Sequence, residues 1–173
     1  MFKIISIFLF YLFLVTGICY SQEKIVFIDI NYIFKNSYAG IDLNDQISKK
    51  DKELKLEITK YESEIEKEKK KILSQKNVLS VKEFNEKVKI LEESIKIKNS
   101  ELAAKNNEFL LFKKKIENLF SKKLNSIIEE YSLENSINVI LKKENLLMAK
   151  KNLDITQPVF SIFNERIKKI NLN

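Results

Sequence analysis

The stretch LSVKEF, residues 79–84, separates two long series of apolar residues and decides whether the chain is one rod or a hairpin. Upstream, apolar residues recur in alternating steps of three and four, as in a coiled-coil seam, at Ile47, Leu54, Ile58, Tyr61, Ile65 and Ile72. A second series, interrupted by Lys98 and Lys105, comprises Val81, Phe84, Val88, Leu91, Ile95, Leu102, Phe109, Phe112, Ile116 and Leu119. Extending the first series by seven from Ile72 reaches Leu79, and the offset of two residues to Val81 rotates the apolar stripe by about 200°. One straight helix therefore cannot present both series to one partner.

The same stretch carries the signals of a new helix start. Ser80 can cap a helix, Glu83 stands where it completes a capping box, and Leu79 with Phe84 forms a hydrophobic staple. We therefore predict an antiparallel hairpin arm over residues 43–131, with its tip near 77–80 and an outgoing helix over about 43–76 that reaches roughly 50 Å. A kinked continuous helix is the alternative, because the stretch contains no Gly or Pro.

The two ends of the chain predict a small mixed body over residues 22–42 and 132–173. KIVFIDI (24–30), INVIL (137–141) and LLMA (146–149) are short apolar runs typical of strands, and the last two look like a hairpin. A final helix follows, with Thr156 as its cap and Pro158 in its first turn. The apolar phase also drifts to Phe120, Leu124, Ile127 and Tyr131, as expected if this part of the long helix packs on the body. The fold class is mainly α with a small β body.

The predicted body is too small to be secure alone. It has about sixty residues and three short strands with exposed edges, and such cores are marginal while open edges invite pairing. We expect oligomerisation through the body. The candidate residues are Ile25, Phe27, Val139, Ile140, Leu141 and Leu147.

The amino terminus resembles a secretory signal. Lys3 precedes an uncharged apolar run over residues 4–18, and small residues at Cys19 and Ser21 predict cleavage of residues 1–21. Two alternatives are an uncleaved membrane anchor and a lipid-modified Cys19, the latter disfavoured by Ile18 before it. With cleavage, the chain loses its only cysteine.

The composition leaves little equipment for catalysis. The chain has 1 Cys and no His, and no phosphate-binding loop is present. Glu129, Glu130 and Asp29 are the carboxylates that could form a catalytic pair, but capping, edge protection or solvation explains them better because no pocket or nucleophile accompanies them. We predict no enzyme activity, no cofactor and no metal site.

The order strand, short helix, long hairpin, strands and capped last helix resembles the Skp/OmpH family of periplasmic chaperones. The likeness rests on KIVFIDINYIF (24–34) and NVILKKENLLMAKKNLDIT (138–156), and Lys150 with Lys151 departs from the family's approach to Asp-Ile-Thr. The resemblance implies a homotrimer whose β segments form a barrel-like body, and arms that enclose an unfolded client.

Charge and stray apolar residues indicate how the arms would hold a client. Between Lys49 and Lys123 there are 21 lysines and 14 acidic residues, a difference of +7. This excess would attract anionic unfolded chains and makes anionic membrane lipids a further candidate partner. For any single lysine, a solvated face with intrahelical pairs such as Glu66 with Lys70 is the better explanation. The candidate client-binding residues are Lys69, Lys70, Lys71, Leu73, Lys89, Ile90, Ile97, Leu110 and Leu111.

These features favour an ATP-independent holdase that binds unfolded outer-membrane proteins in the periplasm. The alternative is a structural coiled-coil protein of the cell envelope, anchored by an uncleaved amino-terminal segment. A nucleic-acid binder is disfavoured by the export signal despite the lysine content.

Overall fold

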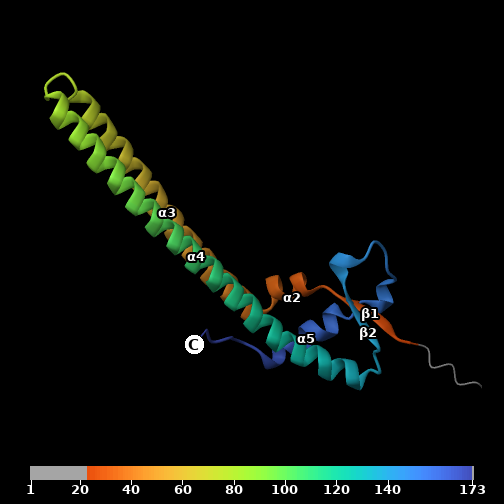
Figure 1. Ribbon diagram of the computed structural model, residues 1–173. Helices are drawn as coiled ribbons and strands as arrows, with labels where there is room; N and C mark the ends of the chain where they lie inside the picture. The colour runs from red at the N-terminus through yellow and green to blue at the C-terminus, as the bar shows by residue number, and fades with distance from the viewer. Residues whose placement is uncertain (1–22, 173) are drawn as a thin grey trace, which may run out of the picture.

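The computed structural model describes residues 23–172, which form a long two-helix arm on a small body (Figure 1). The elements in chain order are β1 (Ile25–Ile28), α2 (Ile30–Asn36), α3 (Tyr38–Ser74), α4 (Val81–Glu134), β2 (Val139–Lys142), the 3₁₀ turns η1 (Lys143–Asn145) and η2 (Lys151–Leu153), and α5 (Thr156–Arg166). The predicted fold class, mainly α with a helical hairpin and a small β body, is confirmed. The predicted signal peptide and its alternatives lie outside the described residues.

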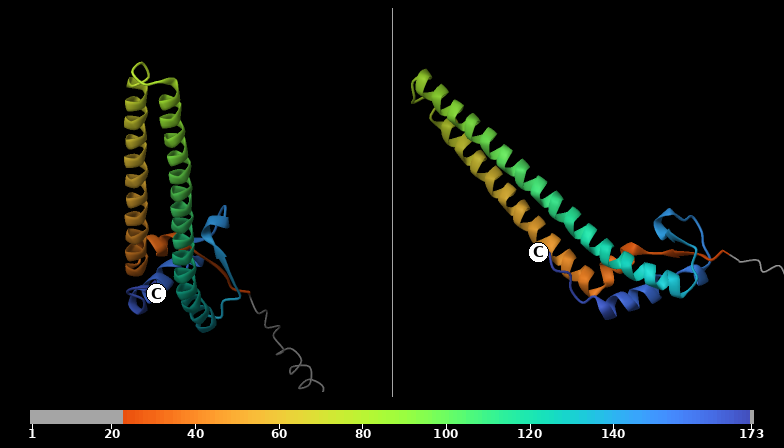
Figure 2. Two further views of the ribbon diagram at one scale, coloured as in Figure 1. Left: turned by 60° about the vertical axis from the view of Figure 1, so that its left-hand side comes forward. Right: turned by 60° about the horizontal axis from the view of Figure 1, so that its bottom comes forward.

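The arm consists of α3 and the amino-terminal part of α4, which run antiparallel and side by side in both views of Figure 2. The turn between them occupies residues 75–80. Ser80 and Glu83 form the predicted capping box: the Glu83 N–H donates to Ser80 Oγ at 3.3 Å, and the Ser80 N–H donates to Glu83 Oε2 at 3.0 Å. The chain reverses where the two apolar series change phase, so one kinked helix is excluded.

The apolar series lie between the two helices, where most of their side chains are half-buried. Two-helix packing covers only one side of each helix, so full burial is reached only at Ile72 near the tip and at Ile116 near the body. The predicted place of Val81 in the second apolar series is wrong, because its side chain is exposed. It stands at the first residue of α4, before the helix has come alongside α3.

The outgoing helix begins five residues earlier than predicted, at Tyr38, because Ser37 ends α2 and caps α3. Ser37 Oγ accepts a hydrogen bond from the Gly40 N–H at 3.1 Å. A Cβ at Gly40 would collide with the carbonyl oxygen of Phe34. The crossing of α2 and α3 therefore requires glycine at this position.

The β part of the body is a pair of parallel strands, β1 and β2, with Ile25 opposite Val139 and Ile28 opposite Lys142. The predicted third strand over residues 146–149 is wrong: within the described chain this segment pairs with nothing. The reason is that η1 turns the chain away from β2, so the expected hairpin cannot form. The other edge of β1 meets residue Asp154 instead, and the Ile155 N–H donates to the Phe27 carbonyl at 3.0 Å.

Helix α5 begins at Thr156, with Pro158 in its first turn as predicted. The predicted capping role of Thr156 is wrong. Its hydroxyl accepts a hydrogen bond from the Asp29 N–H at 2.9 Å, while Asp154 Oδ1 accepts from the Thr156 N–H at 2.9 Å. Thr156 thus ties the last helix to the end of β1, over 127 residues of sequence separation.

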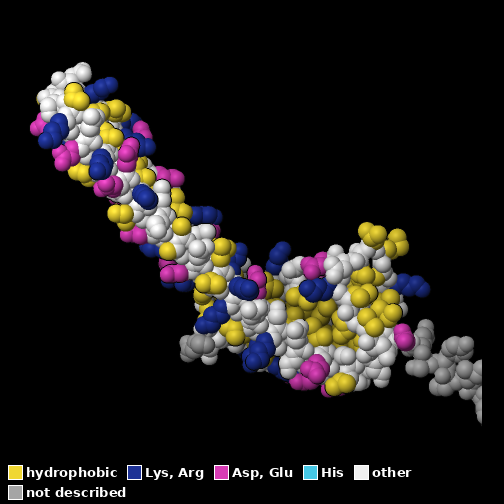
Figure 3. All heavy atoms as spheres, viewed as in Figure 1, with side chains coloured by type: hydrophobic (Ala, Val, Ile, Leu, Met, Phe, Trp, Pro, Cys, Tyr) yellow, Lys and Arg dark blue, Asp and Glu magenta, His cyan; other side chains and the backbone are white. Residues whose placement is uncertain are grey.

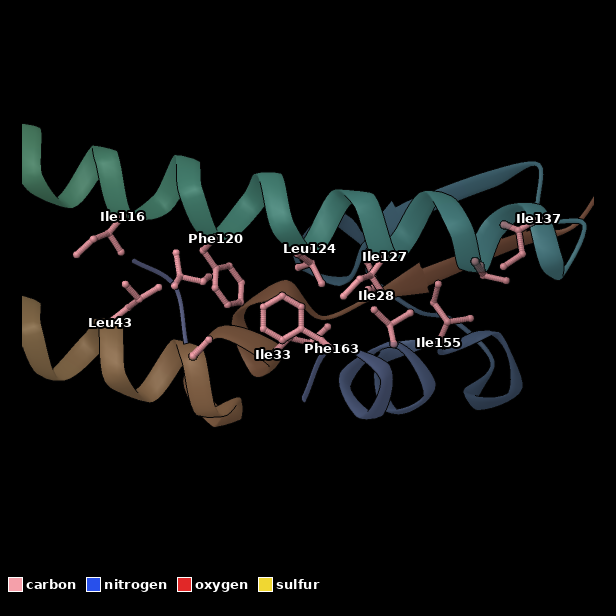
Figure 4. Packing of buried hydrophobic residues seen from close by; sticks show 14 residues of the cluster. Ile28, Ile33, Leu43, Ile116, Phe120, Leu124, Ile127, Ile137, Ile155 and Phe163 are labelled. Carbon is pink, nitrogen blue, oxygen red and sulfur yellow. The ribbon is translucent and has the colours of Figure 1, made fainter. Parts of the chain in front are cut away.

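The hydrophobic core lies in the body, where α4, α5, α2 and the strands converge (Figure 4). Phe120, Leu124 and Ile127 of α4 are buried there, which confirms the expectation drawn from the drifting apolar phase. The Phe120 ring contacts Phe34 and Phe163 with centroids 4.9 and 5.1 Å apart. Within residues 23–172, we find no helix with the length and apolar character needed to cross a bilayer.

Candidate functional site

The five aliphatic side chains that sequence analysis placed outside the seam of the arm are all exposed. They are between 52% and 67% exposed: Leu73, Ile90, Ile97, Leu110 and Leu111. Ile90, Ile97 and Leu111 are spaced by seven and fourteen residues, so they follow one face of α4. The structure therefore spreads these residues along the arm as a dispersed apolar surface. Sequence analysis missed Leu56 and Val78, which are more exposed than any of the five.

One of the five, Leu73, borders an apolar groove near the tip. The groove has a volume of about 220 Å³ and is lined by Lys69, Ile72, Leu73, Phe84, Val88, Leu91, Glu92 and Ile95. It combines two residues of the predicted client-binding set, Leu73 and Lys69, with half-buried residues of the second apolar series. The groove therefore presents an apolar concave surface to an apolar side chain of a partner.

The four lysines of the predicted client-binding set divide into two kinds. Lys70 and Lys71 pair with Glu66 and Glu68 of the same helix, at 3.4 and 3.5 Å. These exposed intrahelical pairs are weak and leave the ammonium groups in water. For Lys69 and Lys89, the described chain offers no carboxylate within 4.0 Å.

Lys98 and Lys105, the two polar interruptions of the second apolar series, meet a single carboxylate across the hairpin. Lys105 Nζ lies 2.6 Å from Glu57 Oε2, and Lys98 Nζ lies 3.4 Å from Glu57 Oε1. The hydrogen bond from Lys105, together with the charge of both lysines, lowers the pKa of Glu57 below its ordinary value. This cluster links α4 to α3 across the hairpin. The sequence signal that points to Glu57 is the pair of lysines at seam positions, where an acidic residue on the other helix is the natural partner.

Four of the six residues predicted for oligomerisation are exposed on the body: Ile25, Val139, Leu141 and Leu147. Phe27 is buried within the chain itself, and Ile140 is half-buried against the core. β1 is paired with β2 along one edge and with Asp154 along the other, so neither backbone edge of β1 at Phe27 is free to pair with a second copy. Leu147 and its neighbour Met148 are almost completely exposed, and Met148 was not predicted. Figure 3 shows apolar side chains gathered on this face of the body.

The outer edge of β2 is open within the described chain, since the sheet has only two strands. Residues 146–150 follow η1 without strand pairing, with extended backbone at Leu146 (φ −109°, ψ 131°) and Lys150 (φ −71°, ψ 138°) and a bend at Leu147. A free strand edge, an unpaired segment and exposed apolar side chains thus lie together in one region of the body.

Two of the three carboxylates considered for catalysis, Asp29 and Glu130, have structural partners. Asp29 caps α2 by accepting from the Tyr32 N–H at 2.8 Å, and Lys143 Nζ lies 3.0 Å from its other oxygen. Partial burial raises the pKa of Asp29, but these hydrogen bonds outweigh burial and lower it overall. Glu130 pairs with Arg166 of α5. Among residues 23–172 we find no group of three acidic side chains arranged to hold a metal ion.

Comparison with known proteins decides the family. The family model described as "Outer membrane protein (OmpH-like)" matches residues 24–162. The chain belongs to the OmpH-like family. The match of this OmpH-like chain takes in β1, the whole arm and most of α5, so the resemblance seen in the sequence is confirmed.

A solved OmpH-like structure has the same fold. The crystal structure of a candidate outer membrane chaperone (OmpH-like) from Caulobacter crescentus CB15 aligns with a TM-score of 0.73 and 16% identity. The alignment covers 87% of this chain and 89% of that one. No curated protein matches. At this identity the likeness establishes the OmpH-like fold alone.

Proposed function

We propose that the protein is an ATP-independent holdase chaperone of the periplasm that binds unfolded outer-membrane proteins between basic helical arms and keeps them from aggregating. The observation that carries the proposal is the row of exposed aliphatic side chains along an arm about 55 Å long. Membership of the OmpH-like family supports it. Under this proposal the protein is not an enzyme and has no nucleic-acid partner.

Holding and release follow from many weak contacts. Each aliphatic residue of the arm contributes little alone, because it covers only a small apolar area. Several contacts to one unfolded chain add through effective concentration, while each one breaks quickly. Release therefore needs no nucleotide. The lysine excess of the arm increases the rate at which anionic segments arrive, and this effect weakens with salt.

We further propose that three copies assemble through the body. Support comes from the exposed apolar residues Ile25, Val139, Leu141 and Leu147 and from the open edge of β2. The segment over residues 146–149 suits addition to the β2 edge of a neighbouring copy, because it is apolar and unpaired within the described chain. The arms would then project together and enclose a client.

Export to the periplasm by a cleavable signal over residues 1–21 remains part of the proposal. The family supports this location. Sequencing the amino terminus of the protein recovered from the cell envelope tests it, and we expect Gln22 as the first residue.

The decisive experiment is suppression of aggregation. A urea-denatured outer-membrane β-barrel protein is diluted into buffer with equimolar assemblies of this protein, without nucleotide, and light scattering is followed. We expect scattering to be largely suppressed. A variant with Ile90, Ile97 and Leu111 changed to Ser should protect less, because it removes three contacts from one face of α4.

A matched control changes three exposed, uncharged polar residues of α4 near the body to Ala: Asn118, Ser121 and Asn125. It leaves the net charge and the aliphatic row of the arm intact, so we expect normal protection.

The scattering assay, together with carbonate extraction of membranes, separates the holdase from a structural envelope protein. An envelope spacer would leave scattering unchanged and would remain with the membranes after extraction. Either unchanged scattering with the wild type or equal protection by the two triple variants would contradict the proposed client surface.

A further inference from the structure

The segment after α5, residues 167–172, runs back along the base of the arm (Figures 1 and 2). We call this segment the tail. Helix α5 ends at Arg166, and Ile167 leaves the helix with φ of −118° and ψ of 92°. The tail contains no helix and no paired strand. The family match stops at residue 162, so the tail lies outside the segment that the family model covers.

One tail side chain is anchored in the hydrophobic core. Ile170 is 4% exposed and belongs to the same buried cluster as Leu43 of α3 and Ile116 of α4. Leu43 and Ile116 face each other in Figure 4. Ile167 and Leu172 are half-buried against this cluster. The end of a chain is ordered where it is tied down, so these contacts hold the tail against the two helices.

Two lysines of the tail contact the first turns of α3. Lys168 Nζ lies 4.8 Å from the centre of the Tyr38 ring, in a cation–π contact. Lys169 Nζ lies 3.8 Å from Asp42 Oδ1. Both lysine side chains are largely exposed, so each contact is weak and is screened by salt.

The tail contacts α4 as well. Lys115 of α4 donates a hydrogen bond from Nζ to the Leu172 carbonyl. Lys115 directly precedes Ile116, and Asp42 directly precedes Leu43, so the polar contacts lie at the same level of the arm as the buried anchor. The tail therefore bridges α3 and α4 where the arm joins the body.

This level is also where a bend of the arm is expected. On the body side, α4 is held by the buried side chains of Phe120, Leu124 and Ile127. Toward the tip, Ile116 is the last fully buried side chain of α4. Hinges lie where a well-held part of a molecule meets a less well-held part. A change in the direction of the arm would therefore occur beside Ile116, at the level that the tail bridges.

We propose that the tail is a releasable strap that restrains the arm. While the tail is seated, α3 and α4 are held together at the base and the arm keeps one direction; when the tail is released, the arm bends beside Ile116. Only Ile170 is fully buried and the lysine contacts are exposed, so the tail can leave without unfolding of the body. Release should increase with ionic strength, because salt screens the lysine contacts. The inference does not depend on the holdase function, because it concerns the arm in the absence of a client.

Distances between pairs of spin labels, measured by double electron–electron resonance, test the restraint. Asn99→Cys on the arm and Ser161→Cys on α5 occupy exposed positions and report the direction of the arm relative to the body. Glu62→Cys with Asn99→Cys reports the pairing of the two arm helices. The full chain is used, with Cys19→Ser to remove its only cysteine. Labelled chains are mixed with an excess of unlabelled chains, so that only distances within one chain are recorded.

For the chain with an intact tail, we expect a narrow distribution of arm-to-body distances. Ile170→Ser should make this distribution at least about twofold wider, because the tail loses its anchor. Lys168→Gln with Lys169→Gln should widen it less and should abolish most of its further widening by salt. The matched control, Lys150→Gln with Lys151→Gln, removes the same charge from exposed positions of the body and should leave the width unchanged. The distance between the two arm helices should stay the same throughout.

Several results would overturn the inference. Equal widths for the intact tail and Ile170→Ser would show that the tail does not restrain the arm. Equal widening of the distance between the two arm helices would assign Ile170 to general packing. If Ile170→Ser does not fold, the exposed lysine pair decides, and a width equal to that of the matched control would exclude the strap. Aggregation suppression is measured separately, so a failure of the strap leaves the holdase proposal to its own test.

Discussion

The arm and the body of this protein are stabilised in different ways. In the arm, two helices face each other along a half-buried seam, and their contacts repeat every seven residues. In the body, segments from both ends of the chain bury side chains such as Phe163, Val159 and Ile33 completely. Loss of one contact in a repetitive seam is shared by its neighbours, whereas loss of one core residue opens a cavity. The arm can therefore expose aliphatic residues, as the proposed client binding requires, while the body maintains the fold.

The largest expected effect is that of Phe163→Ala in the body. The ring is fully buried and contacts Phe120, so its removal should lower the free energy of unfolding by about 3–5 kcal/mol. Phe109→Ala in the half-buried arm seam is the matched control, with an expected loss of about 1–2 kcal/mol. Urea unfolding followed by circular dichroism measures both. Equal losses would remove the distinction between the two regions.

A second change tests the junction of the two regions. Gly40→Ala places a Cβ against the Phe34 carbonyl, so α2 and α3 must shift apart. This shift should lower the free energy of unfolding by about 1–3 kcal/mol. Asn44→Ala, one turn later on an exposed position of α3, should instead be neutral or slightly stabilising because alanine favours helix. Thermal unfolding of the two variants provides the comparison. A Gly40→Ala protein as stable as the wild type would show that α2 and α3 can separate freely.

The tip should respond more weakly. Ser80→Ala removes the capping box of α4, with an expected cost of about 1 kcal/mol confined to the end of the arm. Ser100→Ala, within α4, is the control and should have almost no effect. Hydrogen exchange should accelerate at residues 81–84 in the first variant alone. Faster exchange in the body as well would mean that tip and body unfold as one unit.

The smallest effect is expected at the Glu57 cluster, where it depends on pH. Because Lys105 and Lys98 lower the pKa of Glu57 in the folded protein, its contribution is complete above the ordinary value of 4.5. That contribution is lost as the pH falls through the lower folded value. Glu57→Gln should flatten the acid side of the stability profile, and Glu62→Gln should not. Identical acid profiles for the wild type and Glu57→Gln would show that the cluster contributes nothing to stability.

Local patterns predicted the arm well because its structure is local. The seven-residue spacing placed the seam, and Ser80 with Glu83 placed the restart of the helix. The exposed aliphatic residues were predicted as the apolar residues of the arm that do not fit the spacing of the seam. Glu57 was missed because its role appears only when the register between α3 and α4 is known. Val81 was assigned wrongly because a helix terminus does not yet face its partner.

The body was predicted less well because its contacts join distant segments. Its strands were recognised, but the parallel pairing of Ile25 with Val139 was not, since nothing in a short apolar run specifies its partner. For the same reason the segment over residues 146–149 was expected to form a hairpin. Thr156 was taken for a cap, although its hydroxyl bonds to the main chain of Asp29, which is distant in sequence.

Helix α4 passes without interruption from the tip into the core, over 54 residues or about 80 Å. A sideways force on the tip is therefore transmitted along α4 to the body, where the buried side chains of Phe120, Leu124 and Ile127 hold the helix. Tilting of α4 relative to the body would require these side chains to leave the core. In the proposed assembly, the spacing between neighbouring arms would be set by this packing at the base, and the force that a captured chain exerts on a tip would act there.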